Sequence, residues 1–513
     1  MTTLIPNADE GAGSDDLGGL VDLAGGGAAA TCVETNCAVV FLVGELAVKL
    51  KKPVDVGFGD FTTPAARRRA CQREVELNRR LAPDVYLGVL DVRGPDGNCW
   101  ESLVAMRRMP AETRLSTLVT GGGSARAPVR ALARRLAGFH SAARSSAEIT
   151  AAGGRDALRQ RWEANLAAIR PLGGPVLDVR ELAELARLAS RYLAGREPLF
   201  AARMAAGLIR DGHGDLTAED VFCLPDGPRV LDCLEFDDRL RFLDGLDDVA
   251  SLALDLERLG AGELARGLLD DYHQFTGTRR VVSLEHHYLA YRAVVRAMVE
   301  GVRYRQGVEG TAEAIRSLAG RALVHLRRGA TRLVLLGGSP GTGKSTLAGA
   351  LADRLGWVLL GSDRVRGELV GQSAEDGAGA ALRSARYRPE WTERTYTELL
   401  ARSGELLALG ESVVLDATWG SARQRSRARA VAERTSADLV ELRCWAPPHM
   451  VAARLRARAG TGDPSDADEL IAAALDRAAD PWPEAIAVNT AGSPADALGR
   501  ALAAGRAGAA SPT

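Results

Sequence analysis

Eight residues, Gly338 to Ser345, have the types and spacing of a loop that holds phosphate groups. They read Gly-Ser-Pro-Gly-Thr-Gly-Lys-Ser, a complete G-x-x-x-x-G-K-[ST] pattern. Glycines allow backbone N–H groups to curl around phosphate oxygens, and a helix that begins there directs its positive end at the same anion. Lys344 is predicted to reach the β- and γ-phosphates, and the Ser345 hydroxyl to ligate Mg²⁺.

The neighbouring sequence supplies the elements that such a loop needs. The apolar run 333–336 predicts a strand before it, and Leu347, Leu351 and Leu355 repeat every four residues after it, which predicts a helix. An ordinary glycine-rich turn is the alternative, but motif and context together favour a nucleotide-binding loop. The predicted nucleotide contacts are Gly338, Ser339, Pro340, Gly341, Thr342, Gly343, Lys344, Ser345 and Thr346.

Lysine is rare in this chain. Lys49, Lys51, Lys52 and Lys344 are the four lysines among 65 basic residues, and the other 61 are arginines. A compact ammonium suits a phosphate differently from a planar guanidinium, so lysines in this background indicate special sites. The three near the N-terminus make that region a candidate for a second nucleotide site.

The N-terminal region pairs a strand lysine with a helix glutamate. Two apolar runs, 39–43 and 46–50, predict a β-hairpin, and Lys49 lies late in its second strand. Glu74 lies in a predicted helix, 64–81. This order is typical of the small lobe of a kinase, although a solvated lysine pair and a surface glutamate are the alternative for the pattern taken alone. Further strands are predicted at 86–92 and 100–109.

Three carboxylates further along have the order of a phosphoryl-transfer site. Asp215 follows His213-Gly214 on a predicted loop, Asp220 comes five residues later, and Asp232 follows an apolar pair. A kinase needs one carboxylate to orient the attacking hydroxyl and accept its proton, and further ligands for the Mg²⁺ that bridges the phosphates.

These residues together resemble the aminoglycoside phosphotransferase type of kinase, whose members carry an HGDLHxxN catalytic loop and a later IDxxxF metal segment. The resemblance implies that Asp215 is the catalytic base and Asp232 a metal ligand, and that Lys49 and Glu74 form the ion pair at the nucleotide. Asp220 stands where the family has Asn, and we predict it as a second metal ligand.

The C-terminal half predicts alternating strands and helices, hence a parallel sheet covered on both faces. Asp416 ends the apolar strand SVVLD, where a carboxylate that organises Mg²⁺ is expected. Asp363 is predicted at the end of the strand in WVLLGSD, as the base for an acceptor hydroxyl, and Arg366 as the anchor of an anionic acceptor. Ligands bind at the carboxyl ends of such strands.

An arginine-rich stretch, MVAARLRARAGTGDPSDADELI, precedes the last predicted strand. Arg454, Arg456 and Arg458 beside its Gly/Asp/Pro/Ser loop resemble the lid of gluconate, shikimate and nucleotide kinases. The resemblance implies that Arg454 stabilises the transferring phosphoryl group and that Arg458 contacts the substrate. A solvated helix face is the alternative in so arginine-rich a chain, and Arg423 and Arg425 are weaker candidates.

The whole chain resembles bacterial two-part proteins that join an aminoglycoside-phosphotransferase-like domain to an AAA-type or P-loop kinase domain. The predicted fold class is an α+β, protein-kinase-like two-lobed domain followed by an α/β P-loop kinase domain with a parallel sheet covered by helices. The predicted parts are a loose N-terminal segment (1–30), a small lobe (about 31–110), a large lobe (about 111–310), a helical connector (311–330), the P-loop domain (331–493) and a C-terminal tail (494–513).

Composition narrows the class of function. Sixty-five basic and 66 acidic residues give a net charge of −1, which argues against a nucleic-acid or membrane-surface protein. Seven scattered cysteines predict reduced thiols, and no run is apolar enough to cross a bilayer, so we expect a cytoplasmic protein. We predict an ATP- or GTP-dependent, Mg²⁺-dependent phosphotransferase acting on a small hydroxylated metabolite through two nucleotide-binding domains.

Three alternatives stay open. In one, the protein is regulatory, and its N-terminal kinase-like domain senses a nucleotide with little catalysis of its own. In another, it is a stress or binding protein that only holds nucleotide. Aminoglycoside resistance is less favoured, because an aminoglycoside pocket should be strongly acidic and DDRLRFLDGLDD is the one acidic stretch that qualifies. Neither the acceptor nor the oligomeric state follows from the sequence.

Overall fold

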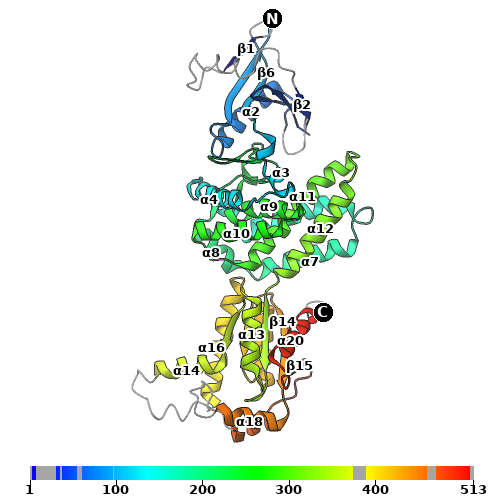
Figure 1. Cartoon of the computed structure of the whole chain (residues 1–513). Helices are drawn as coiled ribbons and strands as arrows, with labels where there is room; N and C mark the ends of the chain where they lie inside the picture. The colour runs from blue at the N-terminus through cyan, green and yellow to red at the C-terminus, as the bar shows by residue number, and fades with distance from the viewer. Residues whose placement is uncertain are drawn as a thin grey trace. The chain divides into compact units, whose positions relative to one another are not determined.

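The computed structural model describes residues 3–6, 31–34, 37–54, 60–95, 98–373, 389–458 and 469–508. The chain divides into two compact units (Figure 1). Unit 1 comprises Met1–Leu158, Arg203–Arg280 and Tyr291–Val295, and unit 2 comprises Arg159–Ala202, Val281–Ala290 and Arg296–Thr513. Helices α6 (Arg155–Ile169), α8 (Glu197–Ala205) and α11 (Val282–Arg305) contribute residues to both units.

Unit 1 contains a six-stranded antiparallel sheet. Its strand order is β1 (Thr3–Pro6), β5 (Tyr86–Arg93), β6 (Cys99–Arg107), β4 (Leu46–Lys51), β3 (Ala38–Val43) and β2 (Thr31–Glu34). Gly44, with φ 55°, turns the chain between β3 and β4, so the predicted hairpin is confirmed. Since successive strand residues point to opposite faces, Lys49 and Lys51 of β4 share one face of the sheet.

Helix α2 (Pro64–Asn78) packs on this sheet through buried Cys71 and Val75. It begins where expected, because Pro64 occupies its first turn and the Thr63 side chain accepts a hydrogen bond from the Ala66 N–H at 3.2 Å.

The prediction of a loose N-terminal segment over residues 1–30 is partly wrong. Residues 3–6 are strand β1 rather than a loose lead-in, because they pair with the edge strand β5; residues 7–30 lie outside the described part.

The remainder of unit 1 is mostly helical and forms a second lobe (Figure 1). Its helices are α3 (Leu115–Thr120), α4 (Arg126–Ala142), α5 (Ala147–Ala152), α9 (Gly245–Arg258) and α10 (Gly262–Thr276), with short turns η1 (Ala111–Thr113) and η3 (Asp238–Leu240). Two small antiparallel pairs, β7 (Ile209–Asp211) with β10 (Phe242–Asp244) and β8 (Val221–Leu224) with β9 (Gly227–Val230), frame the loop that carries Asp215 and Asp220.

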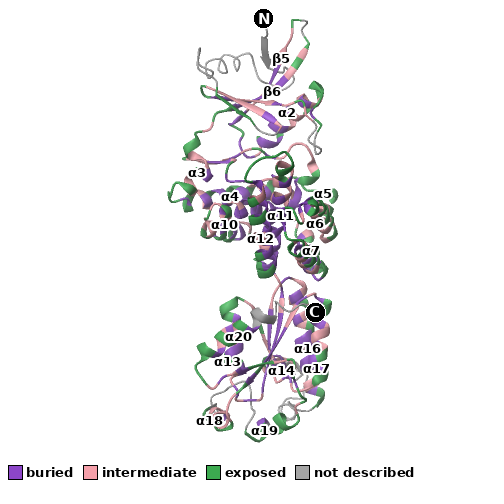
Figure 2. Ribbon diagram, turned by 90° about the vertical axis from the view of Figure 1, so that its right-hand side faces the viewer, coloured by how far each residue is buried: buried purple, intermediate pink, exposed green. Residues whose placement is uncertain are grey.

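Unit 2 contains a five-stranded parallel sheet in the order β12 (Val358–Gly361), β13 (Val413–Asp416), β11 (Arg332–Gly337), β14 (Asp438–Trp445) and β15 (Ile486–Asn489). Helices α13 (Lys344–Leu355) and α20 (Pro494–Gly508) cover one face, and α16 (Pro389–Ala408) and α17 (Ala422–Arg434) cover the other (Figure 2). Alternate residues of β11 serve the two cores, Val334 and Leu336 on the α13 side and Leu333 and Leu335 on the α16 side. The predicted fold class is confirmed.

The C-terminal prediction is corrected. Residues 494–508 form helix α20 instead of a tail, and Ala497, Ala501 and Ala504 are buried in the α13 core. Their spacing of four and three residues places them on one face of a helix, which small side chains allow to pack closely. Three further helices complete this part of unit 2: α14 (Ser362–Ser373), α18 (Pro448–Arg458) and α19 (Glu469–Arg477).

The predicted domain boundary also differs from the observed one. Helices α7 (Val179–Ala194) and α12 (Thr311–Arg328) belong to unit 2 and pack on each other. The helix predicted for the connector is therefore present over residues 311–328, but it is part of unit 2. Arg196 explains part of this grouping. Its fully buried guanidinium donates to the Thr435 carbonyl at 2.8 Å and to the Thr331 hydroxyl, at the start of the sheet. A turn, η2 (Arg170–Leu172), follows α6.

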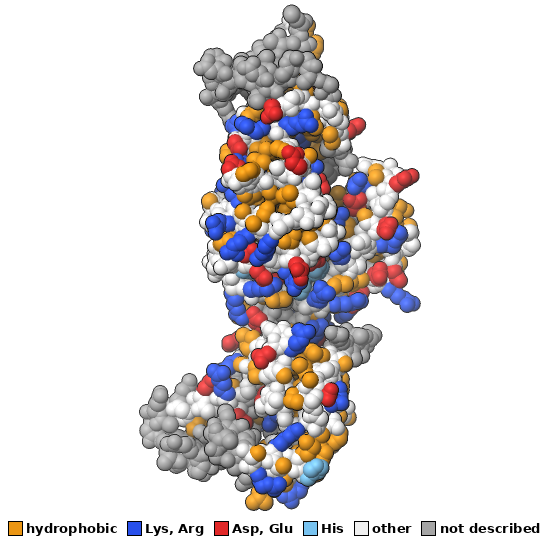
Figure 3. Space-filling model, in the orientation of Figure 1, with side chains coloured by type: hydrophobic (Ala, Val, Ile, Leu, Met, Phe, Trp, Pro, Cys, Tyr) orange, Lys and Arg blue, Asp and Glu red, His pale blue; other side chains and the backbone are white. Residues whose placement is uncertain are grey.

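The surface carries both signs of charge. Basic and acidic side chains are interspersed over the face drawn in Figure 3. In the part of the chain that the structure describes, no helix combines the length and the apolar character needed to span a membrane.

Candidate active sites

Lys49 lies at the centre of the site predicted in unit 1. Its Nζ is 2.9 Å from Glu74 Oε1 and 2.7 Å from Asp232 Oδ1. The Lys49 ammonium lowers the pKa of Asp232. Burial alone would raise the pKa of Glu74, but Lys49 and Lys51 outweigh it and lower that pKa. The predicted strand–helix ion pair is therefore present, and it also reaches the predicted metal ligand.

A second lysine, to which the sequence analysis gave no role, extends this arrangement. Lys51 Nζ lies 2.7 Å from Glu74 Oε2 and 2.6 Å from Glu235 Oε1. Its side chain is 1% exposed, against 13% for Lys49. The two-residue spacing of Lys49 and Lys51 in a strand was the signal available in the sequence.

The predicted catalytic loop brings three carboxylates together. Burial, then the charge of Asp232, then that of Asp215 raise the pKa of Asp220, to about 8. The Thr217 hydroxyl donates to Asp220 Oδ2 at 2.6 Å and opposes this shift. Asp220 is also tied to the metal segment, because its carbonyl accepts the Leu231 N–H at 2.9 Å.

Asp232 has an unusual backbone. Its φ of 62° lies in the left-handed region, which non-glycine residues rarely occupy. The Tyr86 hydroxyl accepts its N–H at 3.2 Å, and the Asn78 side chain accepts the N–H of Cys233 at 2.9 Å. Strain held in this way by neighbouring contacts is common at functional sites.

Asp248 and Arg292 hold the backbone of the catalytic loop. The buried Asp248 carboxylate accepts the N–H groups of His213 at 2.7 Å and Gly214 at 2.9 Å. Arg292 donates to the Gly214 carbonyl at 2.7 Å and pairs with Asp247 at the same distance. The contact of Arg292 with Gly214 spans 78 residues, so no local sequence motif indicated it.

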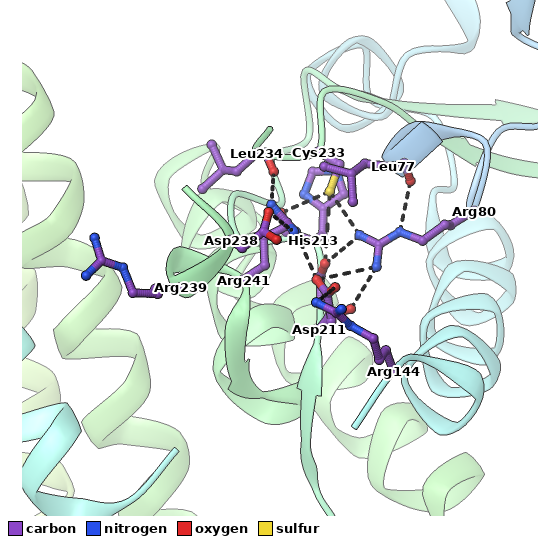
Figure 4. Close-up of polar contacts among 12 residues, drawn as sticks. Leu77, Arg80, Arg144, Asp211, His213, Cys233, Leu234, Asp238, Arg239 and Arg241 are labelled. Atoms are coloured by element: carbon purple, nitrogen blue, oxygen red, sulfur yellow. Dashed lines mark hydrogen bonds and ion pairs between the residues drawn. The ribbon is translucent and has the colours of Figure 1, made fainter. Parts of the chain in front are cut away.

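Asp211, just before this loop, is the centre of a cluster of arginines (Figure 4). Arg241 Nε lies 2.9 Å from its carboxylate, and Arg80 and Arg144 lie at 3.5 and 3.4 Å. Arg80 also donates to the carbonyls of Asp211 and Gly212, at 2.9 and 2.8 Å. The end of helix α2 is thereby fixed to the start of the loop that carries Asp215.

No group of three or more His, Cys, Asp or Glu side chains among the described residues is placed to hold a metal ion by itself. Asp220 and Asp232 nevertheless suit Mg²⁺, which prefers oxygen ligands and takes one or two carboxylates together with nucleotide phosphates and water. The two predicted ligands therefore fit a Mg²⁺–nucleotide complex.

In unit 2 the loop between β11 and α13 depends on its glycines. Gly338, Gly341 and Gly343 have φ of 137°, 82° and 83°. A Cβ on Gly338 would lie 2.6 Å from the Cys444 carbonyl oxygen, and one on Gly341 would lie 3.0 Å from Leu455 Cγ. Glycine therefore lets the loop approach β14 and α18. Pro340 and Thr342 are buried within it.

A cavity of about 580 Å³ lies beside this loop and is lined by Lys344, Ser345, Thr346, Asp363 and Asp416, among others. Burial raises the pKa of Asp416, while the charge of Lys344 and a hydrogen bond with Ser345 oppose the shift. Its buried Oδ1 has no hydrogen-bond partner among the described residues. A buried carboxylate oxygen beside a hydroxyl is a donor set that suits Mg²⁺.

The predicted acceptor side is close by. Asp363 is in the first turn of α14 rather than at a strand end, because β12 stops at Gly361. Arg366 Nη1 lies 2.7 Å from Asp363 Oδ1, as i, i+3 neighbours on a helix allow. Tyr396, which sequence reasoning missed, is buried nearby and its hydroxyl lies 3.1 Å from Thr418 Oγ1.

The lid residues are only partly described. Arg454 of α18 donates to the Thr490 carbonyl at 2.7 Å and to the Gly341 carbonyl at 3.5 Å, and it lines the cavity. Arg456 pairs with Glu469 at 2.8 Å. Arg458 ends α18, but its side chain and residues 459–468 lie outside the described residues.

Two residues named in the sequence analysis, Ser339 and Arg425, make contacts that the sequence did not predict. Ser339 Oγ donates to Asp476 Oδ1 at 2.8 Å, a contact between the phosphate loop and α19 that no motif indicated. Arg425 donates to the carbonyls of Trp419 and Pro481, at 2.8 and 2.6 Å, so its guanidinium is engaged in structure. Arg423 is exposed.

The fold combines a protein-kinase-like lobed part and a P-loop kinase fold with a parallel sheet in one chain. Residues 333–481 match the sequence model of the AAA domain. The chain belongs to the family of the uncharacterized protein Rv2004c of Mycobacterium tuberculosis, to which it is 42% identical over 469 residues, 91% of this chain and 94% of that protein.

Solved structures resemble each part. The choline/ethanolamine kinase family protein from Mesorhizobium loti is 14% identical with a TM-score of 0.36, and covers 61% of this chain and 99% of its own. The gluconokinase from Sinorhizobium meliloti 1021 is 21% identical with a TM-score of 0.26, and covers 35% of this chain and 94% of its own.

Proposed function

We propose that this protein is an ATP- or GTP- and Mg²⁺-dependent phosphotransferase with a nucleotide site in each unit, and that the unit 2 site phosphorylates a small hydroxylated metabolite. One observation supports this most. Lys344, Ser345, Asp416 and Asp363 line a single cavity of about 580 Å³, within the usual range for a small-molecule site.

The polar residues in and beside this cavity have roles that their chemistry supports. Lys344 and the glycine loop hold the phosphates, and Ser345 and Asp416 would hold Mg²⁺, which neutralises the developing charge when bound. Asp363 accepts the proton of the acceptor hydroxyl. The hydroxyl oxygen bonds to the γ-phosphorus, and the bond between the γ-phosphorus and the β-phosphate oxygen breaks, which releases the nucleoside diphosphate. Arg366 orients Asp363 and favours an anionic acceptor, and Arg454 encloses the nucleotide side.

In unit 1 the same chemistry would use Asp215 as base, Asp220 and Asp232 at Mg²⁺, and Lys49 at the phosphates. A second candidate function for this unit, nucleotide sensing with little transfer, is favoured by one feature. Asp220 adds a carboxylate near Asp215 and Asp232, and burial first, then the charges of these two residues, raise its pKa to about 8, which disfavours a third negative charge there.

A phosphorylation screen of a metabolite library, followed by mass spectrometry, tests the proposal on the full chain. Products that need Lys344, or Asp215, identify the acceptor of each unit. If Lys344→Ala abolishes every transfer and Asp215→Ala none, unit 1 is a sensor. If the unmodified chain transfers phosphate to no sugar, aminoglycoside or nucleotide precursor, the phosphotransferase proposal is wrong.

A further inference from the structure

The unit 1 site contains two parallel ion-pair bridges between the same three segments. Lys49 joins Glu74 of α2 to Asp232, and Lys51 joins Glu74 to Glu235. Each lysine therefore links strand β4 to the helix and to the segment that carries the predicted metal ligand. The five charged groups alternate in sign along this chain of contacts, and Glu74 uses one carboxylate oxygen for each lysine.

The two bridges differ in burial. The outer bridge reaches Asp232, whose side chain is 54% exposed. The inner bridge is closed, because Lys51 is 1% exposed and Glu235 is 10% exposed. Lys51 also lies over the Phe61 ring, 5.4 Å from its centroid. A ligand that arrives from solvent can therefore contact Lys49 and Asp232 but leaves Lys51 in place.

This difference matters when a Mg²⁺–nucleotide complex binds, an event that rests on the function proposed for unit 1. Asp232 would turn to the metal and Lys49 to a phosphate, so the outer bridge loses contacts. A fully buried carboxylate that loses its only cation is strongly destabilised. Glu74 avoids this state because Lys51 remains 2.7 Å away.

We propose that Lys51 is a positioning residue, which holds Glu74 and Glu235 so that Lys49 is free to bind nucleotide phosphate. The kinase arrangement that the sequence resembles needs one lysine for both tasks, whereas here two lysines divide them. That Lys51 is a lysine in a chain with 61 arginines agrees with a requirement for a compact ammonium between two carboxylates.

Without Lys51, Lys49 alone would have to neutralise the Glu74 carboxylate and bind the nucleotide phosphate. With Lys51→Met, Glu74 has Lys49 as its remaining cation among these contacts and holds it back from the phosphate, so nucleotide affinity should fall at least tenfold. The double variant Lys51→Met/Glu235→Gln removes both charges of the inner pair and should recover thermal stability. It should not recover affinity, because Glu74 still depends on Lys49. If Lys51 had only a structural role, the double variant would recover both thermal stability and nucleotide affinity.

The measurement is titration of the full-length chain with a Mg²⁺ complex of a non-hydrolysable ATP analogue. All variants are made in a Lys344→Ala background, called the parent, in which unit 2 should not bind nucleotide, so that the titration reports on unit 1. Lys51→Arg, which keeps the charge, should bind more tightly than Lys51→Met, and Lys52→Met, which loses an outlying pair with Glu34, should match the parent.

Three outcomes are decisive. Recovered stability with an affinity still at least tenfold below the parent supports the proposal. Affinity equal to the parent in Lys51→Met, or restored along with stability in the double variant, overturns it while leaving the nucleotide site intact. No nucleotide uptake by the parent overturns the function proposed for unit 1, and the role of Lys51 with it.

Discussion

The Asp248 carboxylate accepts the backbone N–H of His213 at 2.7 Å, although the two residues are 35 positions apart and both are buried. The position of Asp215, two residues after His213, depends on this contact. Asp248→Asn removes the charge and one acceptor, so we expect unit 1 to lose about 2–4 kcal/mol of unfolding free energy. Urea unfolding read by hydrogen exchange in unit 1 measures this loss.

Asp270→Asn is the matched control, because Asp270 is a half-exposed aspartate that pairs with Arg280 at the surface of the same unit. It should change the unfolding free energy by less than about 0.5–1 kcal/mol. Equal losses in the two variants would contradict the positioning role of Asp248.

Arg196 should be equally important to unit 2. Arg196→Met leaves the carbonyls of Gly195 and Thr435 without the donor that now lies 2.8 Å from each. We expect a loss of about 1–3 kcal/mol, measured by thermal unfolding of the full chain. Arg187→Met, which breaks an exposed pair with Glu184, should lower stability by less than about 1 kcal/mol. A silent Arg196 variant would show that helix α7 is not anchored to the sheet in this way.

The phosphate loop should not tolerate a side chain at Gly341. Its φ is 82°, and an added Cβ would lie 3.0 Å from both Leu455 and Val451. We expect Gly341→Ala to weaken nucleotide binding by unit 2 about tenfold, since left-handed backbone costs other residues about 1–2 kcal/mol. Gly349→Ala in α13 meets nothing within 4 Å and should leave affinity unchanged. Fluorescence titration of both variants decides between these expectations.

His287 predicts a pH dependence of stability. Burial and the charge of Arg196 lower its pKa from 6.5 to about 3. In the unfolded chain the His287 imidazole is protonated below pH 6.5, whereas in the folded protein it stays neutral down to about pH 3. The free energy of unfolding therefore falls as the pH falls from 6.5 towards 3. The slope is about 1.4 kcal/mol per pH unit.

His287→Asn should flatten this slope, and the exposed His449→Asn should not. Unfolding free energies measured at pH 7.5, 6 and 5 test the difference. In the folded protein the ring is enclosed: His287 accepts a hydrogen bond from Trp162 Nε1 at 3.0 Å and stacks on Tyr192 with ring centroids 4.4 Å apart. A slope that is the same in all three proteins would contradict this assignment.

Local motifs accounted for the phosphate loop of unit 2. Lys344, Ser345 and Asp416 meet because one strand, one turn and one helix place the first two, and the neighbouring parallel strand ends beside them. Asp363 was predicted at a strand end but lies in the first turn of a helix, because periodicity does not define the boundary of an element to one residue.

Contacts between distant segments were the main gap. Lys51 and Glu235 are 184 positions apart, and Glu235 occupies a variable position of the metal segment, so no motif indicated their contact. The residues of α20 had helical spacing, but an alanine-rich stretch does not reveal whether its face covers a core or meets water. The helices that join unit 2 are likewise amphipathic in sequence, and contacts such as that of the buried Arg196 with the Thr435 carbonyl show which surface they pack against.

Calorimetry with a Mg²⁺ complex of a non-hydrolysable ATP analogue tests the central claim, two nucleotide sites in one chain, most directly. The account predicts two sites in the unmodified protein, one in Lys344→Ala, one in Lys49→Met, and none in the double variant. A single site that survives Lys49→Met unchanged, or two sites that survive Lys344→Ala, would contradict it.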